Sequence, residues 1–570
     1  MRPALLAVLV VAIGCTNPPP PGPAPDLILR GGTIYTLDPQ RSQAEALAVR
    51  QGRIVAIGAG ADVARLAGAG TRLVDLGGRF VMPAFHDAHV HPVSAGVELG
   101  QCNLNDLETA ETTLGAIRAC VDAHVSRAWL VGGGWALPAF PPGRPRKEDL
   151  DLITGNRPAA LSSADGHSLW VNSAALEAAG ITRATKDPEA GRIDRDARGE
   201  PTGLLRESAT ALVSRLVPPP TPEEYDAGLV RAVAEMNRVG IVSFIEASAR
   251  PPVVEAYRAV ARQGKLTARV HLSLYADPDK TESQVDDFVR IRQQASEAGV
   301  TVGAVKIFID GVIEAATASL LEPYLRLAGE SVPAHPRGLP NFADERLKAL
   351  VRRLDREGFQ VHMHAIGDRA IRQGLDAIAD AVRANGPRDR RPHIAHLQLF
   401  HPDDVPRFRE LGVVANIQPL WAYADSYIRT LTEPRLGPER SQWLYPFGAL
   451  QRAGTVLAGG SDWSVSSVNP LQGVQVAVSR RALDAPPDAP SWLPEQRLDL
   501  PSILAAYTNG GAFVSFEDKD SGSLEIGKLA DLIVLDRNLL EIPVEEIHKA
   551  RVLWTLLEGR EVYRADEFRP

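Results

Sequence analysis

The chain has 570 residues, 45% of them hydrophobic and 23% charged, and a formal net charge of -8. This length and apolar content are ample for one large core and a smaller domain. The acidic balance argues against a nucleic-acid partner, because phosphate groups would be repelled. Only three cysteines occur, which excludes a disulfide framework. Of these, Cys102 and Cys120 could pair in an oxidising compartment, but we expect two buried free thiols.

Residues 1–25 have the pattern of an export signal followed by a tether. Arg2 supplies a positive charge, and Ala4–Ile13 is an apolar run too short to span a bilayer. The next residues, up to Cys15, resemble a bacterial lipobox, whose cysteine becomes the lipidated first residue; an ordinary signal peptide cut nearby is the alternative. We predict a signal peptide over 1–15 and a proline-rich tether over 16–25. The protein is then exported to the cell envelope and touches the membrane only through a lipid anchor on Cys15.

Both ends of the remaining chain are rich in short strand-like runs. Over 26–82, runs such as Leu27–Leu29 and Ile54–Ile57 are separated by turns that contain glycine. Residues 511–570 repeat the pattern, with Ala530–Leu535 as an example. Two such ends around a long middle predict one small composite β-sandwich domain formed by both.

The middle, residues 83–510, alternates short apolar runs with helical stretches. Val302–Ile309 is typical of the former, and Glu223–Arg238 and Arg369–Ala384 of the latter. Alternation of strand and helix predicts an α/β fold with a parallel sheet, and the length suits a (β/α)₈ barrel of the TIM type. An open doubly wound sheet is the alternative, disfavoured because no glycine-rich nucleotide loop follows an early strand.

The strongest local signal is a pair of histidines, His89 and His91, within Asp87–Pro92. Residues two apart in a strand point to the same side, so both imidazoles can face one divalent metal. Two histidines this close also occur by chance. The interpretation therefore depends on whether further ligands follow at other strand ends.

Four later strand ends carry residues that can hold a metal. They are Lys306, the pair His362 and His364, the pair His393 and His396, and Asp462. Lys306 lies in an apolar run, where a lysine is costly unless paired or neutralised. His393 and His396 are three apart, so at most one should reach the site. Chemistry in such barrels gathers at the C-terminal ends of the strands, which favours one common site.

The order and surroundings of these residues resemble the amidohydrolase superfamily, in particular its YtcJ-like branch (amidohydrolase family 3), which includes N-substituted formamide deformylases. The matching segments are Asp87–Pro92, Asp165–Ser168, Val171–Leu176, Pro201–Glu207, Val305–Ile307 with Asp310-Gly311, His364–Ala370 and Gly460–Trp463. The resemblance covers nearly the whole chain after the tether. It implies a metal-binding barrel with a composite β-sandwich.

The resemblance also implies a ligand set for the metal. The implied ligands are His89, His91, Lys306, His364, His396 and Asp462. Lys306 matches a lysine that is carboxylated and bridges two metals. His362 has no counterpart in the pattern, and His393 is expected behind the site. Glu246 stands where an aspartate is common.

The expected activity is hydrolysis of a C–N bond of amide type in a small molecule. The cofactor is a divalent metal, one or two zinc ions by default, with iron and manganese left open. Metal lowers the pKa of water, Asp462 accepts its proton, and hydroxide attacks the polarised carbonyl. His167, Trp170 and Asp310 are candidates for substrate contact, although His167 has a structural role at the rim as an equal alternative.

Other functions fit the same residues. A deaminase or lactonase on the same fold would differ in pocket residues that the sequence does not rank. A metal-binding envelope lipoprotein without catalysis is the alternative from another class, and Asp462 argues against it because a binding site needs no spare base. Aromatic residues near the motifs slightly favour an apolar group beside the scissile bond, though aromatic residues are more often core. Assembly into a homo-oligomer is left open.

Overall fold

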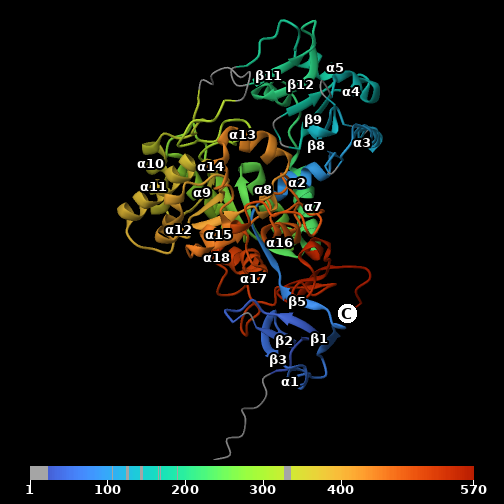
Figure 1. The fold of residues 1–570 in the computed structure, drawn as a ribbon. Helices are drawn as coiled ribbons and strands as arrows, with labels where there is room; N and C mark the ends of the chain where they lie inside the picture. The colour runs from blue at the N-terminus through green and yellow to red at the C-terminus, as the bar shows by residue number, and fades with distance from the viewer. Residues whose placement is uncertain are drawn as a thin grey trace, which may run out of the picture.

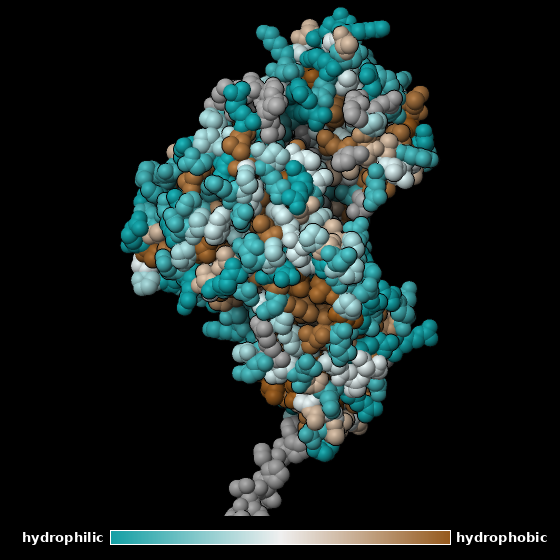
Figure 2. Space-filling model, viewed as in Figure 1, coloured by the Kyte–Doolittle hydropathy of each residue, from teal (hydrophilic) through white to brown (hydrophobic). Residues whose placement is uncertain are grey.

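The computed structural model describes residues 23–40, 42–105, 107–123, 127–141, 145–164, 166, 168–188, 191–326 and 335–569. The predicted signal peptide and Cys15 lie outside these residues. Figure 1 shows three parts stacked along the molecule: a sheet formed by the chain ends, a central barrel and an inserted sheet. The face seen in Figure 2 is mostly hydrophilic. Within the described residues, none of the helices has the length and apolar character needed to cross a membrane.

The central sheet has eight parallel strands. In sheet order they are β19 (Leu457–Gly459), β18 (Val414–Ile417), β17 (His393–His396), β16 (Gln360–Ala365), β15 (Thr301–Phe308), β14 (Arg269–Tyr275), β13 (Ile241–Ala249) and β6 (Phe85–Val90). At the C-terminal ends of β19 and β6, the Asp462 amide donates to the His89 carbonyl at 2.7 Å, and the His91 amide donates to the Trp463 carbonyl at 2.9 Å. These bonds bring the two edges together, so the predicted barrel is confirmed and an open doubly wound sheet is excluded.

Helices cover the outside of the barrel. The main ones are α2 (Pro92–Leu99), α7 (Pro222–Arg238), α8 (Pro251–Arg262), α9 (Gln284–Ser296), α10 (Asp344–Arg356), α11 (Asp368–Asn385), α12 (Val405–Leu411), α15 (Phe447–Arg452), α16 (Pro470–Ser479) and α17 (Leu500–Ala505). Helix α7 begins at a capping box in which the Thr221 side chain accepts from the Glu224 amide and Glu224 bonds back. The predicted helices over 223–238 and 369–384 are confirmed within one residue of each end.

The two chain ends form one sheet. Its order is β22 (Arg560–Arg564), β21 (Val552–Leu557), β20 (Leu532–Leu535), β5 (Phe80–Pro83), β1 (Leu27–Tyr35), β2 (Gln43–Arg50) and β3 (Arg53–Gly58), with β4 (Arg72–Asp75) beside β1. The ends join where β5 pairs antiparallel with β20, Val81 opposite Val534. Both of these side chains are fully buried, so the seam belongs to the core of this part. The prediction that both ends build one β unit is confirmed as a sheet; its description as a sandwich stays a prediction.

A second sheet interrupts the barrel between α2 and α7. Its order is β11 (Gly191–Arg195), β12 (Pro201–Glu207), β10 (Ser168–Val171), β9 (Ala159–Ser163), β8 (Leu130–Trp135) and β7 (Cys102–Asn103). Helices α3 (Ala110–Ala123), α4 (Lys147–Thr154) and α5 (Ser173–Ala178) accompany it. The predicted barrel span of 83–510 therefore contains a six-stranded sheet that the strand and helix pattern did not separate.

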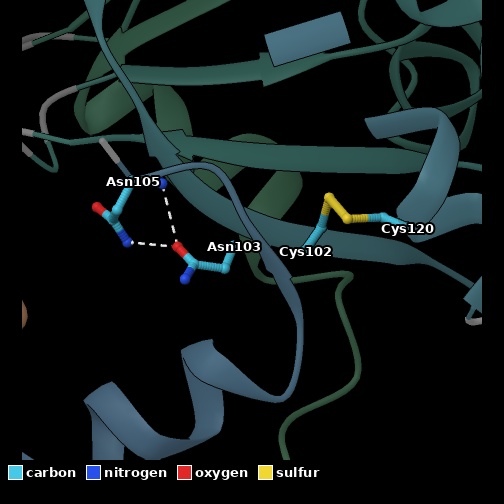
Figure 3. Close-up of a disulfide and its surroundings, with 4 residues drawn as sticks. All are labelled: Cys102, Asn103, Asn105 and Cys120. Atoms are coloured by element: carbon cyan, nitrogen blue, oxygen red, sulfur yellow. Dashed lines mark hydrogen bonds between the residues drawn. A yellow bond between two sulfur atoms is a disulfide. The ribbon is translucent and has the colours of Figure 1, made fainter. Parts of the chain in front are cut away.

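Cys102 and Cys120 form a disulfide, so the expectation of two free thiols is wrong (Figure 3). The bond ties β7, at the edge of the inserted sheet, to α3. Sequence spacing could not decide this, because it depends on where α3 packs. A disulfide of this kind is typical of proteins that fold in an oxidising compartment.

Replacement of both Cys102 and Cys120 by serine should lower the free energy of unfolding of the inserted part. The cysteines are 18 residues apart, and closing a loop of this size is worth about 3 kcal/mol. Denaturant unfolding of the two proteins measures the difference. A thiol-reactive dye that labels both cysteines in unreduced, denatured protein would show that the bond is absent.

Candidate metal centre

His89, His91 and Asp462 form the centre of the candidate site at the C-terminal end of the barrel. His89 lies inside β6 and is fully buried, while His91 is the residue before α2. Asp462 Oδ1 is 3.4 Å from His89 Nε2 and 3.1 Å from His91 Nε2. One donor atom from each residue lies within 4.8 Å of the other two. This spacing suits joint coordination of one divalent cation.

The glycines before Asp462 allow the last strand to approach the first. A Cβ atom on Gly460 would lie 2.8 Å from the His89 backbone nitrogen and Cβ, and one on Gly459 would meet the Tyr507 ring at 2.8 Å. Neither glycine has a positive φ. The pair is therefore required by close packing, not by the tight turn expected from the sequence. Asp462 itself has a φ of 55°, an uncommon conformation for a residue other than glycine.

Lys306 reaches the same centre from β15. Its side chain is fully buried, and its Nζ lies 3.0 Å from His89 Nε2. Burial lowers the pKa of the amine to about 7, although the charges of Asp462 and Glu246 act in the other direction. A lysine at the end of a strand with its amine in water is thereby excluded.

His364 and His396 form the second half of the site. Their ring centroids are 4.5 Å apart, and the His396 ring is 4.7 Å from that of His89. His396 has a φ of 77°, which turns it out of the regular alternation of its strand. Burial lowers the pKa of His364 to about 4 and holds that of His396 well below its usual value. Both imidazoles are neutral at physiological pH and can offer a lone pair to a cation.

The residues present fit a divalent metal. Buried polar atoms in proteins are normally hydrogen-bonded. Among the described residues, His396 Nδ1 is buried and has no hydrogen-bond partner, and Asp462 Oδ1 is buried with only the two imidazoles of His89 and His91 beside it. Imidazole nitrogens with a carboxylate oxygen are a donor set that suits zinc and related ions. The structure thus brings together all six residues that the sequence proposes as ligands.

His362 lies directly beneath His89, a contact that sequence reasoning missed. His362 Nε2 is 2.8 Å from His89 Nδ1, and His362 Nδ1 is 2.9 Å from Ser273 Oγ. The His362 ring stacks on His393 with centroids 4.0 Å apart. If His89 binds metal through Nε2, its Nδ1–H can donate to His362. His362 and His393 therefore form a layer below the ligands.

Replacing His362 by leucine should weaken metal binding by about 10- to 100-fold, because the leucine cannot accept from His89 Nδ1–H. His362→Gln is the matched control, since its amide oxygen can accept the same hydrogen bond. Competition with a chromophoric chelator measures both dissociation constants. Equal affinity of the leucine and glutamine variants would contradict the assigned contact.

The three predicted substrate residues have different positions. His167 lies outside the described residues. Trp170 is fully buried in the inserted sheet, where it packs on Trp135 and Phe140, so it has no free surface for a substrate. Asp310 is also buried, and its carboxylate accepts the amides of Ser319, Ile366 and Gly367.

Two further contacts surround the ligands. Asp310 Oδ1 lies 3.7 Å from His364 Nε2, and we assign it as a positioning residue for that ring. Glu246, buried in β13, places Oε1 3.6 Å from His91 Nδ1 and accepts from Tyr257 Oη at 3.1 Å. Burial lowers the pKa of His91, but Asp462 and Glu246 together raise it to about 9. The sequence could have identified Glu246 as a candidate for the site, because it places a carboxylate inside an apolar strand.

Comparisons with known proteins agree with this architecture. A model of the amidohydrolase family (Amidohydro_3) matches residues 72–563. The chain is 32% identical over 559 residues to the protein LONG AFTER FAR-RED 3 of Arabidopsis thaliana, covering 96% of this chain and 93% of the relative. It is 31% identical to YtcJ of Bacillus subtilis, covering 94% of this chain and 99% of the relative.

More distant relatives extend the same likeness. An N-substituted formamide deformylase of Arthrobacter pascens is 26% identical, covering 94% of this chain and 97% of the relative. The solved structure of a metal-dependent hydrolase from Pyrococcus furiosus superposes with a TM-score of 0.70 at 26% identity, covering 90% of this chain and 100% of that chain. The family match spans most of the chain and the relatives are covered almost completely, so the chain belongs to the amidohydrolase family.

Proposed function

We propose that this protein is a metal-dependent hydrolase that cleaves a C–N bond of amide type in a small molecule. The observation that carries the proposal is the position of Asp462. Its Oδ1 lies within 3.4 Å of two imidazoles that can share a cation with it. Its Oδ2 is 3.9 Å from His396 Nδ1. The Asp462 carboxylate could therefore bind a metal through Oδ1 and accept a proton through Oδ2.

His89, His91 and Asp462 would hold one divalent cation, and His364 and His396 a second. When bound, the metal polarises a carbonyl and lowers the pKa of water. Asp462 Oδ2 takes the proton of the attacking water and returns it to the leaving nitrogen. The barrel strands hold these side chains in place, so little rearrangement precedes the proton transfer.

Lys306 is proposed to carry a carboxyl group. An uncharged amine can add CO₂ to form a carbamate, whose oxygens are suitable ligands for both cations. The position of Lys306 Nζ beside His89 Nε2 supports this assignment. Intact-protein and peptide mass spectrometry under mild conditions should find one added CO₂ on Lys306. An unmodified lysine in active, metal-loaded enzyme would favour a site with one metal, as in a deaminase.

The proposed location is the cell envelope, with the protein anchored through a lipid on Cys15. The disulfide between Cys102 and Cys120 supports export, because such bonds persist in oxidising compartments. Cell fractionation should find the protein in the membrane fraction and Cys15→Ala in the soluble fraction. Membrane attachment of the alanine variant would contradict the lipid anchor.

The proposed activity is tested by metal analysis together with hydrolysis of a panel of N-formyl and N-acyl amines. About two metals per chain and cleavage of C–N bonds would support a bridged-metal amidohydrolase. Bound metal with turnover only of lactones or of exocyclic amino groups would assign a lactonase or deaminase instead. Purified protein that binds no zinc, iron or manganese would defeat the proposal.

A further inference from the structure

Two aromatic side chains line the inner wall of the barrel beside the metal centre. Tyr275 is the last residue of β14, and Phe308 is the last residue of β15. Each lies two positions after a residue that points inward: Ser273, which contacts His362, and Lys306, which contacts His89. Since residues two apart share a face of a strand, Tyr275 and Phe308 point into the mouth of the barrel.

These side chains form a continuous path away from the ligands. Lys306 Nζ lies 4.7 Å from the Phe308 ring, and the centroids of Phe308 and His364 are 5.2 Å apart. The Phe308 and Tyr275 rings follow at 6.1 Å. Both rings are only partly buried, so each keeps surface for a ligand. A flat apolar group could lie along them.

Arg250 closes the path at its outer end. It directly follows β13, is exposed, and places its guanidinium 3.5 Å from the centroid of the Tyr275 ring. Within the part of the chain that the structure describes, the Arg250 side chain forms no ion pair or hydrogen bond. Arg391 differs: it also stacks on a ring, 4.1 Å from Phe513, but its Nη1 pairs with Asp518 at 2.6 Å.

We propose that Arg250 binds a carboxylate at the far end of the substrate, while an apolar or aromatic part of the same molecule lies along Tyr275 and Phe308. The amide bond then reaches the metal centre. The substrate class is an N-acyl or N-formyl amine with an aromatic group and a terminal carboxylate. The inference rests on the proposed hydrolase function and adds recognition of an anion to it.

The chemistry of the guanidinium supports this assignment. Arginine offers a planar set of donors that matches the two oxygens of a carboxylate. Stacking on Tyr275 holds this plane in place, so less side-chain freedom is lost on binding. The chain as a whole is acidic, with a net charge of -8, so an anionic substrate needs a local cation to enter.

The experiment compares binding of matched probes by calorimetry. The probes are 3-phenylpropionate and 4-phenylbutyrate, each against the corresponding primary alcohol, with metal-loaded wild-type protein, Arg250→Met and Arg250→Lys. Arg262→Met is the matched control, because Arg262 is an exposed cation at the far end of α8, the helix that Arg250 precedes. All variants are checked for metal content and thermal unfolding before use.

The wild type and Arg262→Met should bind the acids about tenfold more tightly than the alcohols, the value of one charge-assisted contact. Arg250→Met should lose this preference, and Arg250→Lys should keep only part of it. A preference that survives in Arg250→Met would place the carboxylate elsewhere, for example on the metal, and overturn the inference. A wild-type protein that binds the acids and the alcohols equally tightly would also overturn the inference.

The same samples separate this inference from the proposed function. Protein that holds metal and hydrolyses neutral amides, but shows no dependence on Arg250, defeats the inference alone. Protein that binds the acids through Arg250, but neither holds metal nor hydrolyses any amide, defeats the proposed function alone. With a hydrolysed acid in hand, Arg250→Met should raise KM and leave kcat nearly unchanged.

Discussion

Asp462→Asn should reduce kcat by about 1,000-fold or more with metal still bound, because the amide cannot take a proton from water. The substitution changes little in size, and the two neighbouring histidines still offer ligands. The loss should appear in kcat rather than in KM, since the carboxylate acts on the reacting proton and not on the remote part of the substrate. Steady-state kinetics with metal analysis of the same sample measures it.

Glu246→Gln is the matched control for this variant. It also removes a carboxylate that contacts His91, but on Nδ1, away from Asp462. Its main effect should be weaker metal binding, and excess metal should restore most of the turnover. Near-normal turnover of metal-loaded Asp462→Asn would rule out the proposed proton transfer. Equal losses of kcat in both metal-loaded variants would show that turnover depends on negative charge near His91 and not on a base.

Lys306→Met should lose most activity and at least one metal per chain. Methionine fills the buried space but cannot form a carbamate, so the bridging ligand is gone. Measured on metal-free protein, the free energy of unfolding should not fall, because the substitution removes an amine whose charge is costly in a fully buried position. Metal content, turnover and denaturant unfolding are measured together.

Two companion variants give this prediction its specificity. Lys528→Met removes a lysine that pairs with Glu525 at 3.2 Å in the turn segment before β20, far along the chain from the ligands, and should leave activity intact. Lys306→Ala opens space in which added propionate can supply carboxylate oxygens, so activity should partly return with propionate. Full activity of Lys306→Met without any additive would exclude a ligand role for Lys306.

Much of the site followed from residue types at strand ends. A parallel barrel brings the C-terminal ends of all its strands to one face, so ligand-type residues at those ends converge whatever lies between them. His89, Lys306 and Asp462 were therefore candidates from local pattern alone, whereas His364 was preferred over His362 because of the family resemblance. His396 was ambiguous, because its selection over His393 depends on a backbone φ of 77° that breaks the strand alternation.

Other features depended on contacts between distant segments. In sequence, the inserted sheet has the same short apolar runs and turns as the long loops of a barrel would have. Only the pairing of the strands shows that it is a separate sheet. The pairing of Cys102 with Cys120 required α3 to pack beside β7. Trp170 lies between two segments that match the family, yet its ring lies in the core of the insert.

The sequence by itself determined the barrel, the pairing of the two chain ends in one β unit and the strand ends that carry ligand-type residues, because these depend on local periodicity and on the topology of parallel strands. Only the tertiary structure decided which histidines face the candidate metal centre and which lie beneath them, and which arginine lies at the end of the path along Tyr275. Those outcomes depend on distances of a few ångströms between residues far apart in the chain, which spacing along the sequence does not encode.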